Sequence, residues 1–153
     1  MIPDDVYRSR LQATIEELRY WIPSIADWAR IEPSEAPASW KLSVEPRTAG
    51  AAPFELLLRT DRHYDLSVAG ETFEDQPIDT LDLFLPLVSA ISDGRIIQRR
   101  RLARFTGAPL SVETRIALGD GSVWSRLRTL SAGTAMRPEE IEIRDRHFLP
   151  YRR

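Results

Sequence analysis

Apolar residues near the N-terminus recur at steps of three and four positions. This spacing is typical of one face of an amphipathic helix, which we predict from Asp5 to Ala29. Pro23 cannot donate a backbone hydrogen bond, so it is expected to kink this helix or to split it, with Ser24 capping a second short piece. The apolar face consists of Tyr7, Leu11, Ile15, Leu18, Ile22, Ile25 and Ala29.

Beyond Pro37, apolar and polar residues alternate, which is typical of half-buried strands. The alternation predicts strands at 39–46, 54–60 and 64–68, the last returning antiparallel after a polar turn. These strands form a predicted three-stranded antiparallel meander. The acidic segment 70–76 shows no such alternation, and we interpret it as irregular.

A second helix is predicted where apolar residues again share a helical face. Asp79 is the expected N-cap, and Gly94 lies where a glycine commonly ends a helix. Pro86 falls inside this helix and is expected to bend it. The shared face consists of Leu81, Phe84, Leu85, Val88 and Ile91.

Alternation returns after the second helix, over residues 95–105, 110–118 and 123–130. The order of elements therefore predicts an α+β fold: a helix, a three-stranded meander, a second helix and about three further antiparallel strands. Both helices are expected on one side of the sheet. With 153 residues and 42% hydrophobic content, the chain fits a single domain over 1–153.

The last two predicted strands form a hairpin, because Asp-Gly at 120–121 is typical of a tight turn. A loop of two or four residues pairs Leu118 with Val123, and this register places Arg115 beside Arg126 on the exposed face. The core face then carries Val112, Thr114, Ile116, Leu118, Val123 and Leu127.

Positive charge is concentrated in one part of the chain. Residues 1–94 carry eight Lys or Arg against seventeen Asp or Glu, a net charge of −9, whereas residues 95–130 carry eight Arg against two acidic residues, a net charge of +6. Such a cluster attracts anions or an acidic surface. Nucleic acid is a disfavoured partner, because the acidic first part of the chain would repel phosphate.

The arginines of the last three predicted strands are therefore the candidate anion-binding residues. An alternative interpretation is that they protect an exposed strand edge from aggregation and form ion pairs with the acidic first part of the chain. The candidates are Arg99, Arg101, Arg115, Arg126 and Arg128.

Part of this region resembles the PilZ domain, a β-barrel family that binds a cyclic dinucleotide. The match covers 99–136, with Arg100 and Arg104 at the positions of the family's Arg-x-x-x-Arg motif. Ser131 matches the serine of the second motif, but Thr129 stands where the family has Asp or Asn, and Thr134 where it has Gly. Fewer residues follow 136 than the remaining strands of a barrel need, and we make no assignment from the resemblance.

Catalytic and cofactor signatures are absent from the sequence. No Gly-x-Ser-x-Gly motif occurs, and the two histidines, His63 and His147, stand far apart. The acidic residues between Glu71 and Asp82 do not have the spacing of a calcium loop, and helix capping explains them better. We therefore predict no catalytic residue, no metal site and no cofactor.

The cellular location follows from composition. The chain has no cysteine, which excludes disulfides and fits a reducing compartment. Its N-terminus is acidic and lacks the apolar segment of a secretory signal, and no apolar run approaches the ~20 residues that a membrane span needs. We predict a cytoplasmic protein without membrane contact.

Our first functional hypothesis is a binding or adaptor protein that uses its arginines for an acidic partner or a small anion. We favour it over an enzyme acting on an anionic small molecule, which would need a concave pocket and an acid or base of shifted pKa beside the arginines. The order of elements also resembles bacterial type III secretion chaperones, which are small acidic homodimers that bind peptides. A homodimer is further predicted from the wide apolar stripe of the first helix and the apolar tail Phe148, Leu149 and Tyr151.

Overall fold

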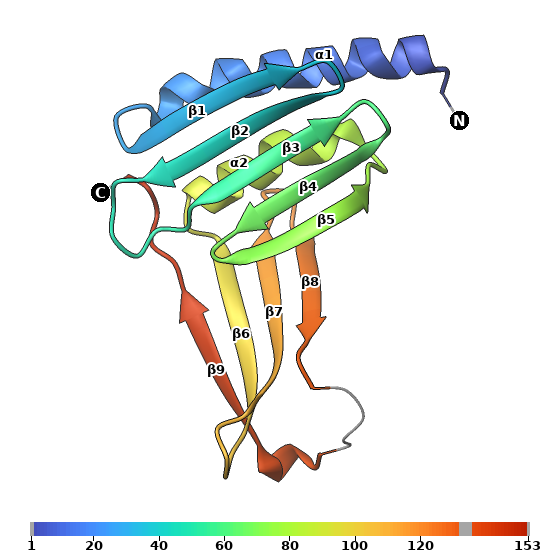
Figure 1. Ribbon diagram of the computed structural model, residues 1–153. Coiled ribbons are helices and arrows are strands. Elements are labelled where there is room, and N and C mark those ends of the chain that lie inside the picture. The colour runs from blue at the N-terminus through green and yellow to red at the C-terminus, as the bar shows by residue number, and fades with distance from the viewer. Residues whose placement is uncertain (1, 132–135, 153) are drawn as a thin grey trace.

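A computed structural model describes residues 2–131 and 136–152 of the chain. They form two α-helices and nine antiparallel strands in two sheets (Figure 1). The first sheet has the order β1-β2-β3-β4-β5, with β1 at Ala29–Ala36, β2 at Ser39–Pro46, β3 at Phe54–Arg59, β4 at His63–Val68 and β5 at Glu71–Pro77. The second has the order β8-β7-β6-β9, with β6 at Ile96–Ala103, β7 at Pro109–Ala117, β8 at Val123–Thr129 and β9 at Ile141–His147. This second sheet projects from the body of the protein, and we call it the stalk.

Helix α1 (Asp4–Trp21) is shorter than the sequence predicted. Pro23 ends the α-helical ladder, and a 3₁₀ turn, η1 (Ile22–Ile25), follows. The Ser24 hydroxyl donates back to the Trp21 carbonyl instead of capping a new helix. The predicted extension of the helix to Ala29 is wrong, because Ala29 begins β1.

The three predicted strands of the meander are the centre of a five-stranded one. β1 was missed because Pro33 lies within it, and proline is tolerated there because β1 is an edge strand whose N–H groups do not all need a partner. β5 occupies the acidic segment that we interpreted as irregular. Its pairing with β4 is interrupted between Tyr64 and Leu66, and Asp75 has a φ of 53°, so the simple alternation of a strand is lost.

Helix α2 (Phe84–Ser92) is preceded by a 3₁₀ turn, η2 (Leu81–Leu83). Thr80, rather than the predicted Asp79, is the cap, since its hydroxyl accepts the Asp82 N–H at 3.2 Å. Pro86 lies in the first turn of α2, where a proline causes least disruption. Gly94 follows the helix with a φ of 76°, which confirms the predicted glycine end.

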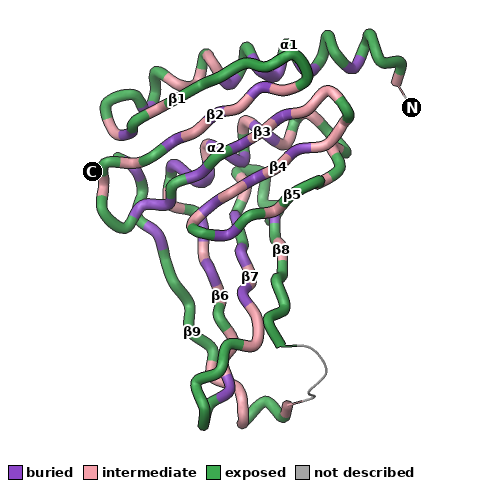
Figure 2. Tube along the Cα trace, viewed as in Figure 1, coloured by how far each residue is buried: buried purple, intermediate pink, exposed green. Residues whose placement is uncertain are grey.

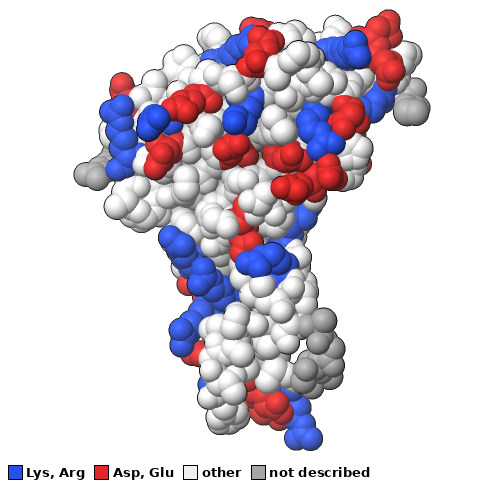
Figure 3. Space-filling model, in the orientation of Figure 1, with Lys and Arg blue, Asp and Glu red and all other residues white. Residues whose placement is uncertain are grey.

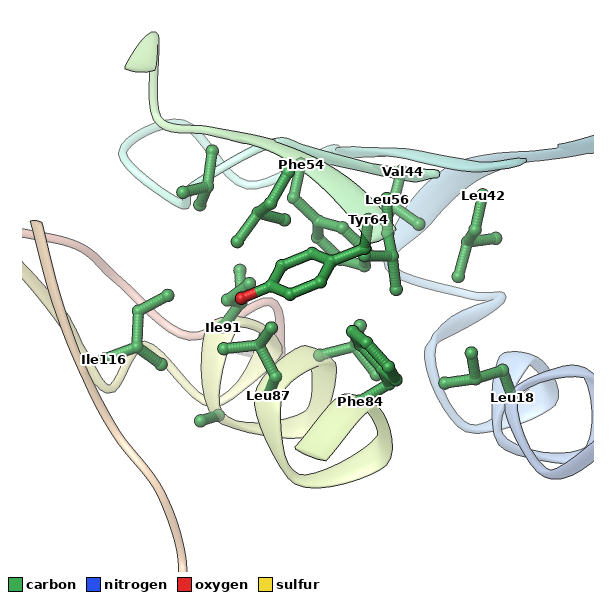
Figure 4. Close-up of a cluster of buried hydrophobic side chains, with 14 of the residues drawn as sticks. Leu18, Leu42, Val44, Phe54, Leu56, Tyr64, Phe84, Leu87, Ile91 and Ile116 are labelled. Atoms are coloured by element: carbon green, nitrogen blue, oxygen red, sulfur yellow. The ribbon is translucent and has the colours of Figure 1, made fainter. Parts of the chain in front are cut away.

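The hydrophobic core lies between the first sheet and the two helices. Figure 4 shows Tyr64 pointing from β4 toward Phe84 and Leu87 of α2, and the Tyr64 and Phe84 rings meet edge-on at 5.1 Å. Ile116 and Trp124 of the stalk belong to the same cluster of buried residues, and the Trp124 Nε1 donates to the Tyr64 hydroxyl at 2.9 Å. Buried residues are thus found in the body and at the near end of the stalk, while the far end is mostly exposed (Figure 2).

The predicted register of the β7–β8 hairpin is wrong by one residue. Ala117 rather than Leu118 pairs with Val123, because the loop has an odd length: the Leu118 N–H donates to the Ser122 carbonyl at 2.9 Å around residues 119–121. Gly121 takes the left-handed position of this turn, with a φ of 89°. Since side chains alternate between faces, the shift exchanges the two faces of β8. Two predicted core residues are consequently exposed, Val123 by 47% and Leu127 by 60%.

The C-terminal segment contains a strand that we did not predict, β9, and then docks on the protein's own body. Phe148 and Tyr151 are buried, and the Tyr151 N–H donates to the Ser92 carbonyl at 2.8 Å. The docking on its own body was one of the two predicted outcomes for this tail. Phe148, Tyr151 and the buried stripe of α1 are therefore packed within one chain, whereas Leu149 is 53% exposed. The packed residues do not supply the free apolar surface from which we predicted a homodimer.

No helix in the described part of the chain is long and apolar enough to cross a membrane. The cytoplasmic location stays a prediction.

Candidate anion-binding face of the stalk

The stalk has two faces, and the structure divides the five candidate arginines between them. We call the face that carries Ile116 and Trp124 into the core the inner face, and the opposite one the outer face. Strand register places Arg126 and Arg128 on the inner face, whereas the outer face receives Arg99, Arg101 and Arg115. The five side chains therefore do not form one patch.

The inner face gains arginines that the sequence analysis did not select. Arg100 on β6 lies directly opposite Arg144 on β9, and the β7 residue on its other side, Val112, pairs with Arg128. This row crosses all four strands, a distance of about 14 Å at the usual interstrand spacing. In the next row, Arg146 of β9 lies opposite Gln98. Recognising β9 as a strand would have revealed the shared face of residues 144 and 146 from their spacing alone.

The two inner-face arginines of β8 hold the stalk to the first sheet. Arg128 donates to both carboxylate oxygens of Glu71 on β5, from Nε at 2.7 Å and from Nη2 at 2.8 Å, and this contact raises the pKa of Arg128. Arg126 donates to Gln76 at 2.8 Å and lies over the Trp124 ring, 4.6 Å from its centroid. These contacts agree with the alternative interpretation, in which arginines pair with the acidic first part of the chain.

Arg100, Arg144 and Arg146 form a second group, which we call the arginine cluster. Arg100 makes no ion pair with the residues that the structure describes. Among these residues Arg144 forms an ion pair only with Glu142, at 3.3 Å. Arg146 lies over the Phe148 ring at 4.6 Å. All three arginines are exposed. Like charges at directly paired positions repel one another, so the cluster favours an anion that neutralises it.

Figure 3 shows how this charge is distributed on the molecular surface. Lys and Arg side chains gather on the stalk just below the first sheet, whereas Asp and Glu side chains are spread over the first sheet with further Lys and Arg side chains among them. In this view the upper part of the stalk is thus a mainly positive surface next to a body of mixed charge.

The outer face is more mixed. Arg99 donates to both oxygens of Asp145, at 2.9 Å and 3.0 Å, and these hydrogen bonds raise the pKa of Arg99 and lower that of Asp145. Arg101 and Arg115 form no ion pair with any described residue, but they share this face with exposed Leu127. We therefore place the candidate site on the inner face.

A cleft of about 700 Å³ lies elsewhere, between α1 and the segment that leads into α2. Arg10 and Arg62 line it together with Asp79 and other residues, but no arginine of the stalk does. Burial is the main cause that raises the pKa of Tyr7 in this cleft. Among the described residues no group of three or more His, Asp or Glu side chains is arranged to hold a metal ion.

The two resemblances noted from the sequence meet different surroundings in the structure. Arg100 lies within β6, but Arg104 follows the strand and donates to the carbonyls of Glu139 and Ile141, and Thr134 falls outside the described residues. Over the residues that the structure describes, the stalk is an open sheet with β8 and β9 at its edges and not a closed barrel. Five strands, rather than three, separate the two helices, which departs from the order of elements that resembles secretion chaperones.

Comparisons of the chain with models of protein families, with curated proteins and with solved structures found no match.

Proposed function

We propose that this chain is a binding protein that holds an acidic segment of a partner protein on the arginine cluster. The observation that carries the proposal is the placement of Arg100 directly opposite Arg144, with Arg146 on the same face. Glu142 is the acidic residue that the structure places beside them. An acidic ligand would relieve this repulsion and would gain charge-assisted hydrogen bonds from guanidinium groups.

The geometry favours an extended acidic segment over a small anion. The arginines lie on an exposed sheet face, whereas a small anion is usually held by donors that converge in a pocket. Arg144 and Arg146 lie two positions apart on one strand, so their backbones are about 7 Å apart. Carboxylates two residues apart in an extended peptide have the same spacing and project from the same side.

Fluorescence anisotropy with a labelled peptide of alternating glutamate and serine tests the proposal. We expect binding that weakens at least about tenfold in the double variant Arg100→Ser/Arg146→Ser. The matched control is Arg8→Ser/Arg47→Ser, which removes the same charge from exposed positions outside the stalk. A peptide of alternating lysine and serine should not bind.

Three outcomes would contradict the proposal. The first is a wild-type chain with no affinity for the acidic peptide. The second is equal weakening of binding by both double variants, which would indicate a response to net charge alone. If inorganic phosphate displaces the peptide at low millimolar concentration in low salt while matched chloride does not, the site is one for a small anion instead.

A further inference from the structure

β9 is the last strand of the stalk and has an open edge. It pairs with β6 on one side, and no described strand lies on the other (Figure 1). The Arg104 N–H donates to the Glu140 carbonyl at 2.8 Å, in line with the β6–β9 register. Because bonded positions alternate in an antiparallel pair, the N–H and C=O groups of Ile143 and Asp145 point away from β6. Such an edge is a template for another strand.

When β9 is paired antiparallel with the β9 strand of a second copy, its acidic and basic residues can lie opposite each other. We propose that two copies of the chain associate by antiparallel pairing of their β9 strands, about a two-fold axis at Ile143. Glu142 of each copy then lies opposite Arg144 of the other, on the inner face. On the outer face the two Ile143 side chains meet at the axis. Ile143 is 55% exposed in the single chain and would be covered by this contact.

Other symmetric registers bring like charges together. A two-fold axis perpendicular to the sheet leaves the inner faces of both copies on the same side of the joined sheet. Because paired residues must lie on the same face, the axis has to pair one residue with the same residue of the second copy and cannot fall between two neighbouring residues. An axis at Glu142 or at Asp145 sets two carboxylates against each other. An axis at Arg144 sets two guanidinium groups together and places Ile143 against Asp145 of the second copy.

The other open edges are less suited to self-pairing. On β8 the alternate residues Arg126 and Arg128 are both basic, and an axis at Leu127 places them opposite each other. Their side chains are already bonded to Gln76 and Glu71 of β5. On β1, Pro33 lies in the middle of the strand and cannot donate a hydrogen bond to a neighbour.

The test is a pair of charge reversals measured by analytical ultracentrifugation. The wild-type chain is expected to shift from its 17.5 kDa monomer mass toward twice that value as its concentration rises over about 1–500 μM. Glu142→Arg alone and Arg144→Glu alone should each stay monomeric, because each sets like charges across the axis. When the two variants are mixed, every pair again joins opposite charges, and a mixed dimer should form.

Three further variants guard against misfolding as an explanation. Ile143→Pro removes an N–H that points away from β6, so it should keep the circular dichroism spectrum of the fold and lose the dimer. The chain has no cysteine, so Ile143→Cys should oxidise to a covalent dimer, whereas Leu127→Cys on exposed β8 should not.

A wild-type chain that remains monomeric throughout would overturn the inference, and so would single variants that still dimerise or a mixture that does not. The inference does not rest on the proposed acidic ligand, although Arg144 belongs to both surfaces. The peptide test alters Arg100 and Arg146 and this one alters Glu142 and Arg144, so failure of one proposal is distinguishable from failure of the other.

Discussion

Arg128 and Glu71 join the stalk to the first sheet through two side-by-side hydrogen bonds, at 2.7 Å and 2.8 Å. Glu71 is only 8% exposed, whereas the Arg128 side chain is 48% exposed, so a change of the Glu71 charge weakens two charge-assisted hydrogen bonds but leaves Arg128 in contact with water. We expect Glu71→Gln to lower the melting temperature by about 5 °C in differential scanning calorimetry. Glu55→Gln is the control, because its pair with Lys41 is long, at 3.6 Å, and half-exposed. Equal shifts for the two variants would show that the Arg128–Glu71 pair does not hold the sheets together.

Thr114 is fully buried in the stalk, and its hydroxyl has no hydrogen-bond partner among the described residues. Replacing a buried hydroxyl that lacks a partner by a methyl group removes a desolvation cost. Thr114→Val is therefore expected to raise the free energy of unfolding by about 1 kcal/mol, measured by urea denaturation. Thr14→Val is the matched control, and it should not stabilise, because the Thr14 hydroxyl donates to the Arg10 carbonyl at 3.1 Å. Destabilisation by Thr114→Val would reveal a partner for this hydroxyl.

Gly94 and Gly70 both have left-handed backbone, with φ values of 76° and 84°, but their surroundings differ. A Cβ at Gly94 would come within 2.7 Å of the Pro150 nitrogen, while nothing lies within 4 Å of one at Gly70. Gly70→Ala should cost only the conformational penalty, about 1 kcal/mol. Gly94→Ala should also displace the docked C-terminal segment and cost at least about 3 kcal/mol. If chemical denaturation gave similar losses in the free energy of unfolding for Gly70→Ala and Gly94→Ala, the C-terminal segment would be able to move away from residue 94 without cost.

Burial raises the pKa of Tyr151 above its ordinary value, since the phenolate is disfavoured inside the core. The unfolded chain therefore loses this proton first, so the stability that Tyr151 contributes is fully present below pH ~10 and declines as the pH rises further. Tyr151→Phe removes a hydrogen bond to the Ala52 carbonyl and should cost about 1 kcal/mol at neutral pH. The gap to the wild type should narrow in urea unfolding at pH ~11. A gap that stays constant between the two pH values would contradict the assigned pKa direction.

The sequence pattern predicted the helices and the central strands, because their apolar residues face one continuous core. It failed where two patterns were compatible with the same residues. In β8, Val123 and Leu127 resemble a core face in the sequence, but the buried residue is Trp124, whose indole N–H donates to the Tyr64 hydroxyl. Arg128 lies on the same face as Trp124 and bonds to Glu71. Periodicity cannot distinguish a loop of odd length from one of even length, and that difference decided which arginines share a face.

β9 escaped prediction for a different reason. Both faces of the stalk are exposed toward its far end, so the strand carries charged residues on each side and lacks the alternation of a half-buried strand. Its partner β6 has the same character over Arg99, Arg100 and Arg101. Only strand pairing, which depends on the path of the whole chain, brings Arg144 opposite Arg100 and so creates the arginine cluster.

The most direct test of the proposed function is a map of where an acidic peptide binds. Amide chemical-shift changes in ¹⁵N-labelled protein, recorded while the alternating glutamate and serine peptide is added, locate contacts residue by residue. We predict saturable changes that centre on Arg100 of β6 and on Arg144 and Arg146 of β9, with little change in α1. Changes centred on the cleft that Arg10 and Arg62 line, or spread over all exposed basic residues without saturation, would contradict the proposal that the arginine cluster is the binding site.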